Sequence, residues 1–123
     1  MVTSSSEKGE NLDRVSILQR LEGSEELLSE LIQLFLGEAP HLLEAMRKSL
    51  QQGDMQQLER SAHSMKGAAS NFLAVGTVGA ASQLENDAKN GNLESAKSSL
   101  ATLEAVVKRL LAALDDMCQG SAK

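Results

Sequence analysis

The chain has 123 residues, which is enough for one domain with a single hydrophobic core. Its 12 Lys and Arg against 17 Asp and Glu give a net charge of −5, which argues against nucleic-acid binding because phosphate neutralisation dominates that affinity. Two Phe are the only aromatic residues and Pro occurs once, so base-stacking platforms and most β-sandwiches are also disfavoured.

The ends of the chain and its single cysteine limit the remaining classes of protein. Cys118 can form no internal disulfide and belongs to no zinc-binding cluster. No apolar run approaches the roughly 20 residues of a membrane span, and the polar start of the chain does not resemble a signal peptide. We therefore expect a cytoplasmic protein without membrane contacts, with flexible flanks at residues 1–11 and 118–123 around a bundle domain at 12–117.

Five helical patterns, and no strand pattern, lie between these flanks. The first is short, at about 13–22, and Gly23 ends it. Ser24 caps a long second helix that ends at Gly53 and that Pro40 should bend or split. The apolar stripe of the second helix comprises Leu28, Ile32, Phe35, Ala39, Leu42, Met46 and Leu50.

The second half of the chain contains three further amphipathic helices. Asp54 caps the third, with Gln57 at capping-box spacing. Gly76 marks the next break, and Thr77 is expected to cap the fourth helix. The turn at 90–92 precedes the fifth helix. The apolar residues of these helices are Met55, Leu58, Ala62, Met65, Ala69 and Phe72, then Val78, Ala81, Leu84 and Ala88, then Leu93, Ala96, Leu100, Leu103, Val107, Leu110, Leu114 and Met117. The pattern predicts an all-α fold, an antiparallel up-and-down four-helix bundle with a short extra N-terminal helix.

The outer face of the third helix carries an unusual set of side chains. His63 lies roughly 120–130° from the centre of the apolar stripe, on the solvent side. Lys66, Gly67 and Ser70 share that face. Gly67 is unexpected because glycine within a helix costs about 1 kcal/mol relative to alanine. Small residues beside an exposed imidazole leave room for a bulky partner, and close helix packing through Gly67 is the alternative explanation.

This group of side chains indicates phosphate chemistry. Neutral imidazole is a competent nucleophile, and the ammonium of Lys66 can offset charge on a transferred phosphoryl group. No Ser or Cys is paired by motif with a base, so a hydrolase is not indicated. A metal site is disfavoured because His41 and His63, the two histidines, lie on different helices. We expect His41 to be an ordinary surface residue.

The run at 62–72, AHSMKGAASNF, resembles the active helix of histidine-containing phosphotransfer (HPt) domains of two-component phosphorelays. The hallmark of that family is A-H-x-x-K-G followed by small residues. Leu84-Glu85 is similar to the L-E pair that the family often carries on the next helix, and the resemblance extends over about 12–114. One position departs from the pattern: the family commonly has Gly ten residues after the histidine, where this chain has Leu73.

The resemblance implies a role for each site residue. His63 would be phosphorylated on Nε2, Lys66 would steer and partly neutralise the phosphate, and Gly67 would leave room for the partner. Ser70 could bind the phosphate or a water molecule. Glu85 either accepts a hydrogen bond from Nδ1–H of His63 or is a surface carboxylate, and the sequence leaves both open.

The implied function is that of a carrier without kinase activity of its own. His63 would accept a phosphoryl group from the aspartate of a receiver domain, for example one belonging to a hybrid sensor histidine kinase, and pass it to another receiver. The receiver would supply Mg²⁺, so no cofactor or metal of the chain's own is expected, and we expect a monomer. The alternatives are an adaptor bundle that binds receivers without accepting phosphate and, with little support, a metal-binding bundle.

The second helix has more apolar residues than one stripe needs. Leu27, Leu31 and Leu34 lie to one side of the stripe and Leu36 to the other. Either the short first helix covers them, through Val15 and Leu18, or part of this surface contacts a receiver. The sequence does not decide between these explanations.

Overall fold

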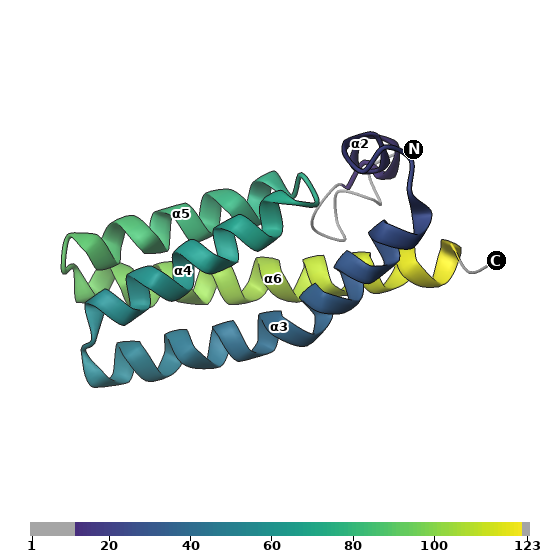
Figure 1. Ribbon diagram of the computed structural model, residues 1–123. Helices are drawn as coiled ribbons and strands as arrows, with labels where there is room; N and C mark the ends of the chain where they lie inside the picture. Colours follow the sequence, from purple (N-terminus) through teal and green to yellow (C-terminus); the bar gives the residue numbers. More distant parts are fainter. Residues whose placement is uncertain (1–11, 122–123) are drawn as a thin grey trace, which may run out of the picture.

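The computed structural model describes residues 12–121, with side chains described as far as Cys118, and this range is helical with no β-strand. The helices are α2 (Arg14–Arg20), α3 (Glu25–Gln52), α4 (Met55–Ser70), α5 (Val75–Lys89) and α6 (Leu93–Ser121). Figure 1 shows α3 to α6 as an elongated bundle and α2 as a short helix at one end. The predicted all-α fold is confirmed. The flank at 1–11 lies outside the described residues, and α6 continues to Ser121.

Each helix of the bundle contacts two neighbours, in the cyclic order α3, α4, α5, α6. The α4–α5 seam and the α3–α6 seam therefore lie on opposite sides of the bundle. Helix α2 packs on α3 and is held there by Ile17, which is fully buried, and by an ion pair between Arg14 and Glu25.

Local capping signals account for most of the helix boundaries. Side-chain oxygens of Ser24, Asp54 and Asn92 each accept a hydrogen bond from a backbone N–H three residues later, at 3.1 Å in all three cases. These bonds satisfy N–H groups that the first turn of a helix leaves without a partner. The predicted starts of α3, α4 and α6 are confirmed.

The turn between α4 and α5 differs from the prediction. Helix α5 begins at Val75, and Thr77 lies inside it as a buried residue rather than at its cap. Phe72 and Ala74 are almost completely buried on either side of the turn. Because both are anchored in the core, the chain reverses at Leu73, with φ +55°, and the next helix starts before Gly76.

Leu73 adopts a left-handed backbone conformation that glycine adopts without steric cost. It is the position at which the HPt pattern commonly has glycine. A side chain in this conformation costs about 1–2 kcal/mol. The end of α4 thus keeps the geometry that a glycine would allow, although the residue itself is different.

Pro40 bends α3 without splitting it. The helix is continuous through Pro40 and changes direction along its length (Figure 1), as expected where a proline removes a hydrogen bond within a helix. Of the predicted stripe residues after the bend, Met46 is fully buried and Leu42 and Leu50 are half-buried against the core, while Leu43 and Ser49 beside them are buried.

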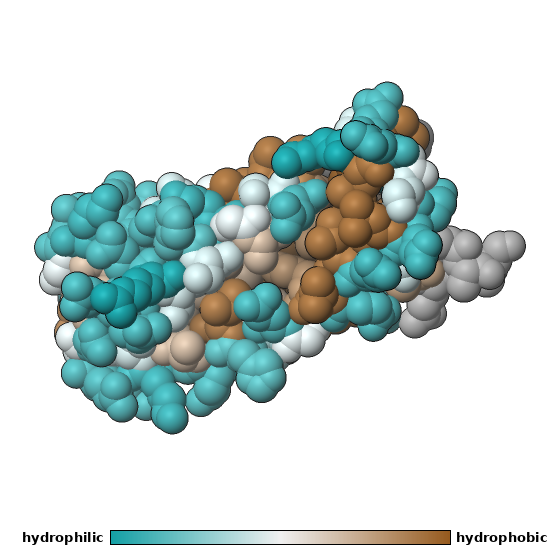
Figure 2. Space-filling model, in the orientation of Figure 1, coloured by the Kyte–Doolittle hydropathy of each residue, from teal (hydrophilic) through white to brown (hydrophobic). Residues whose placement is uncertain are grey.

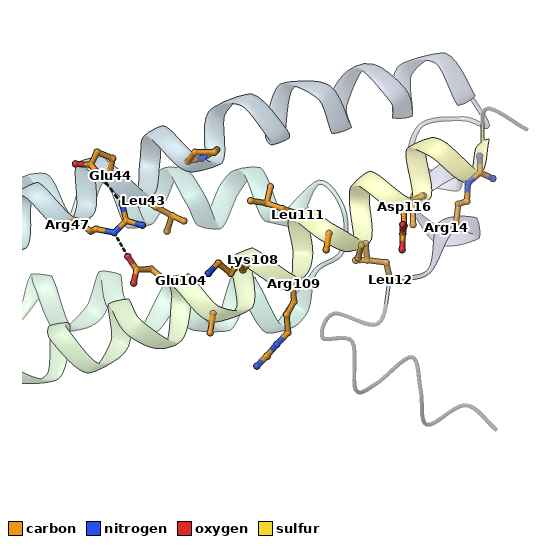
Figure 3. Close-up of a pocket in the computed structure, with 15 residues that line it drawn as sticks. Leu12, Arg14, Leu43, Glu44, Arg47, Glu104, Lys108, Arg109, Leu111 and Asp116 are labelled. Carbon is orange, nitrogen blue, oxygen red and sulfur yellow. Dashed lines mark hydrogen bonds and ion pairs between the residues drawn. The ribbon is translucent and has the colours of Figure 1, made fainter.

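A groove follows the seam between α3 and α6 beyond this bend (Figure 3). Pro40, Leu43 and Leu111 contribute apolar lining. Arg47 lies across the seam and pairs with Glu44 at 2.8 Å and with Glu104 of α6 at 2.5 Å. This groove lies on the side of the bundle opposite the α4–α5 seam.

Exposed apolar side chains gather at the α2 end of the bundle. Figure 2 shows apolar surface there and a hydrophilic surface towards the opposite end. Val15, Leu34 and Val75 are 66%, 66% and 80% exposed, and Leu27 is 39% exposed. Part of the apolar excess predicted for α3 is therefore covered, since Leu31 and Leu36 pack against the core as Leu18 of α2 does. Leu34 of α3 and Val15 of α2 face outward.

A buried carboxylate joins α5 to α6. Asp87 accepts hydrogen bonds from Ser99 at 2.5 Å and from Gln83 at 3.1 Å, and it is only 6% exposed. The hydrogen bond from Ser99, opposed by burial and supported by bonds from Ser95 and Gln83, lowers the pKa of Asp87 below its ordinary value.

We expect Asp87→Ala to lower the free energy of unfolding by about 2 kcal/mol, because it removes the hydrogen bonds that Ser99 and Gln83 donate to a charged, buried carboxylate. Since the folded-state pKa of Asp87 is depressed, its contribution is complete above the pKa of the unfolded chain and is lost as pH falls through the folded-state pKa. Thermal unfolding at neutral pH and below about pH 4 measures this. If the difference in stability between wild type and Asp87→Ala does not become smaller in acid, the stabilising role of the ionised Asp87 is contradicted.

Candidate functional site on helix α4

His63 lies near the middle of α4 and points out of the bundle. Its neighbours Ala62 and Met65 are fully buried on the inner face of the helix. The His63 side chain is 68% exposed. The structure thus places the imidazole on the solvent side, where another molecule can reach it.

Glu85 of α5 connects the two charged or titratable side chains on this face. One carboxylate oxygen, Oε2, lies 2.9 Å from Nδ1 of His63, and the other, Oε1, accepts a 2.6 Å hydrogen bond from Nζ of Lys66. The Glu85 side chain is 15% exposed and that of Lys66 31%. His63 and Lys66, three residues apart and so nearly one turn apart on α4, thus share one largely buried carboxylate across the α4–α5 seam.

The charge of Glu85 fixes which nitrogen of His63 is free. The hydrogen bond from Lys66, opposed by burial and supported by the bond from His63, lowers the pKa of Glu85, so the carboxylate is ionised at neutral pH. An ionised carboxylate can only accept hydrogen bonds. Nδ1 of the neutral ring therefore carries the proton, and Nε2 has an unprotonated lone pair. Among the described residues, Nε2 has no hydrogen-bond partner.

We expect Glu85→Ala to change the tautomer of His63. Without the acceptor, the neutral ring loses its reason to keep the proton on Nδ1. Nitrogen-15 NMR of the neutral ring should show mainly the Nδ1–H tautomer in wild type and a larger share of Nε2–H in the variant. Equal tautomer populations in the two proteins contradict an orienting role for Glu85.

Gly67 leaves open space beside the histidine. A Cβ atom built at this position would meet no heavy atom within 4 Å. Close packing against another helix of the bundle therefore does not explain the glycine. Ser70, one turn further on, donates a 2.7 Å hydrogen bond to the carbonyl oxygen of Gly67, so its hydroxyl is engaged by its own helix.

One cation near this face was not anticipated from the sequence. Nη1 of Arg20, the last residue of α2, donates a 3.2 Å hydrogen bond to the backbone carbonyl of Ser70. The residues are 50 positions apart, and their contact depends on how α2 docks at the end of the bundle. No motif in the sequence indicates it.

The other candidate residues are not part of this site. His41 is exposed on α3. The Cys118 sulfur of α6 lies 3.7 Å from the hydroxyl of Ser29 and 3.6 Å from Nε2 of Gln33 on α3. In the described range, no group of three or more His, Cys, Asp or Glu residues could hold a metal ion. None of the helices in that range has the length and apolar character needed to cross a bilayer.

Comparisons with known proteins agree with the geometry. The family model described as "Hpt domain" matches residues 30–118. The crystal structure of histidine-containing phosphotransfer protein B (HptB) from Pseudomonas aeruginosa PAO1 is similar, with a TM-score of 0.81 and 29% sequence identity. That match covers 88% of this chain and 94% of the other. No curated protein matches the chain significantly.

The fold and the family match agree: the bundle has the architecture of a histidine-containing phosphotransfer protein and presents an exposed histidine beside a carboxylate of the next helix. The family match covers well over half of the chain, and the chain therefore belongs to the Hpt domain family. Proteins of this family are phosphotransfer intermediates in two-component signalling rather than kinases, and they interact with receiver domains.

Proposed function

We propose that His63 accepts a phosphoryl group through Nε2 from the aspartyl phosphate of one receiver domain and passes it to the aspartate of another. The observation that carries this proposal is the pairing of an exposed imidazole with a carboxylate at 2.9 Å on its other nitrogen. That pairing leaves the Nε2 lone pair directed away from Glu85. Phosphoryl transfer depends mainly on alignment and charge neutralisation, and this arrangement contributes to the first.

The transfer step exchanges one bond to phosphorus for another. The Nε2 lone pair forms a P–N bond while the P–O bond to the receiver's aspartate breaks, and the aspartate leaves as a carboxylate. The proton on Nδ1 stays in place, so the phosphorylated ring is an imidazolium. Glu85 lies beside this new positive charge and stabilises it. A receiver's Mg²⁺ would neutralise charge at the phosphoryl group, while His63 supplies the nucleophile and Glu85 holds its ring proton.

Lys66 balances the charge of Glu85. Without the Lys66 ammonium, the negative charge of Glu85 would be left unbalanced and would repel the incoming phosphoryl group. We expect Lys66→Ala to slow transfer from a phosphorylated receiver by about tenfold without abolishing it, a smaller effect than loss of a buried oxyanion donor because the site is partly exposed. Rapid-quench measurement of transfer rates tests this.

A second variant separates two roles of Lys66. If Lys66 acts by balancing Glu85, Lys66→Ala should slow transfer less when Glu85 is already replaced by Gln than when it is present. If the ammonium acts on the phosphoryl group directly, Lys66→Ala should slow transfer equally in both backgrounds. Circular dichroism of each variant provides the control for folding.

The surface near His63 is suited to docking a partner protein. A stable protein interface covers about 800 Å² on each partner, a patch roughly 16 Å in radius. Such a patch centred on His63 extends along α4 towards the α2 end, where Val15 and Val75 are exposed. Exposed apolar clusters of this kind mark interaction sites.

The direct test mixes the chain with a panel of receivers that carry labelled phosphate on their aspartates. We expect the label to move to this chain and to be acid-labile and base-stable, as phosphohistidine is. Incubation with ATP alone should leave the chain unlabelled. Binding to a phosphorylated receiver without uptake of label would instead support an adaptor.

A further inference from the structure

Arg20 places a second positive charge at the end of the face that carries His63. Ser70, whose carbonyl oxygen accepts a hydrogen bond from Arg20, is seven residues after His63. Seven residues make almost two full helical turns, so the two positions lie on the same side of α4 and about 10 Å apart along its axis. Gly67 lies between them and is open to solvent.

Arg20 has no acidic partner in the described part of the chain. Its side chain forms none of the ion pairs there, and its hydrogen bond is to a neutral carbonyl. By contrast, Lys66 on the same face is already paired with Glu85 at 2.6 Å. Arg20 is exposed and keeps donors available, because a guanidinium has five N–H groups.

The position of Arg20 falls within the area that a docked receiver must cover. A patch about 16 Å in radius around His63 includes a group two turns away on the same side of the helix. A receiver that uses Mg²⁺ holds the ion with carboxylates, so the surface it brings to His63 is acidic around its phosphorylation site. An unpaired guanidinium at this distance attracts such a surface and can pair with a carboxylate at its rim.

We propose that Arg20 is a docking residue that pairs with an acidic group of the receiver and speeds formation of the productive complex. This inference rests on the proposed function, because it requires transfer between His63 and a receiver. It assigns Arg20 no contact with the phosphoryl group. The bond to Ser70 holds the guanidinium on the α4 side of α2 and leaves its other donors free to bind a partner.

A purely structural role predicts different behaviour. A cation at the C-terminal end of a helix stabilises that helix, so Arg20→Ala could simply weaken the contact between α2 and α4. In that case the variant would be less stable but would accept phosphate normally. The two roles therefore separate when docking and chemistry are measured independently.

The experiment compares Arg20→Ala, Arg20→Glu and the control Arg109→Ala. Arg109 is also exposed and, in the described range, without an ion pair, but it lines the groove on the opposite side of the bundle. Each protein is assayed with a phosphorylated receiver, at ionic strengths of about 0.01 M and 0.5 M. Each is also assayed with phosphoramidate, a small phosphoryl donor that needs no docking.

We expect Arg20→Ala to lower kcat/KM with the receiver about five- to tenfold at low ionic strength and Arg20→Glu to lower it further, as charges at an interface rim affect association most. The differences should shrink at high ionic strength, phosphoramidate rates should not change, and Arg109→Ala should match wild type.

Wild-type rates for Arg20→Glu with the receiver, or equal losses with receiver and phosphoramidate, overturn the proposal. If wild type accepts label from neither donor, or accepts no more than His63→Gln assayed in parallel, the proposed function itself is contradicted.

Discussion

Replacement of His63 by Gln should abolish acceptance of phosphate from every receiver while leaving the fold intact. The amide cannot act as the nucleophile, since its nitrogen has no available lone pair of the imidazole kind. The side chain is 68% exposed, so the substitution disturbs no core packing, and surface changes of this kind usually alter stability by less than about 0.5 kcal/mol. Labelled transfer and thermal unfolding measure the two effects.

His41→Gln is the matched control for that substitution. His41 is the other histidine of the chain and is exposed on α3. We expect it to accept no phosphate and its variant to transfer at the wild-type rate. Residual label on His63→Gln, or a loss of transfer in His41→Gln, shows that phosphate is carried elsewhere.

A larger side chain at Gly67 should separate folding from transfer. A Cβ there meets nothing within 4 Å, so Gly67→Ala should raise the free energy of unfolding by about 1 kcal/mol, the usual gain from removing glycine within a helix. Gly67→Leu should also fold. Its branched side chain would occupy the space through which a receiver approaches His63, and we expect transfer to fall about a hundredfold or more, since small misplacements of reacting groups have effects of that size.

Phosphoramidate distinguishes a blocked partner from a damaged histidine. We expect Gly67→Leu to accept phosphate from this small donor at nearly the wild-type rate. If Gly67→Leu takes phosphate from receivers as fast as wild type does, the glycine serves no docking purpose. If Gly67→Ala is less stable than wild type, the added methyl group meets a neighbouring atom and the space beside Gly67 is not open.

The elements that could be predicted from the sequence are those set by local interactions. Ser24, Asp54 and Asn92 cap helices by bonding backbone groups three residues away, and the apolar stripe of α4 depends only on helical periodicity. The outward direction of His63 follows from that same stripe. These features need no knowledge of how the helices meet.

The errors arise where tertiary packing outweighs local preference. Thr77 is a good capping residue, yet burial of Phe72 and Ala74 moved the turn to Leu73 and placed Thr77 inside α5. Pro40 disturbs α3, but whether it bends or splits the helix depends on packing around it and could not be derived from the sequence. Leu42 and Leu43 both lie near the edge of the apolar stripe, and only the packing of α3 decides that Leu43 is the more deeply buried of the two.

The parts of the site that join different helices were the least predictable. The sequence left Glu85 either beside His63 or on the surface, because the register of α5 against α4 is set by packing. The hydrogen bond from Lys66 to Glu85 was not anticipated, and it gives Lys66 a partner within the resting protein. Arg20 reaches Ser70 only because α2 docks over the end of the bundle.

Phosphorus and nitrogen NMR of the chain after reaction with a phosphorylated receiver identifies the atom that carries the phosphate. We expect one phosphoramidate signal whose phosphorus is coupled to Nε2 of His63, with Nδ1 still protonated beside Glu85. Phosphorus bonded to Nδ1, or to any other residue, would contradict the proposed role of Nε2.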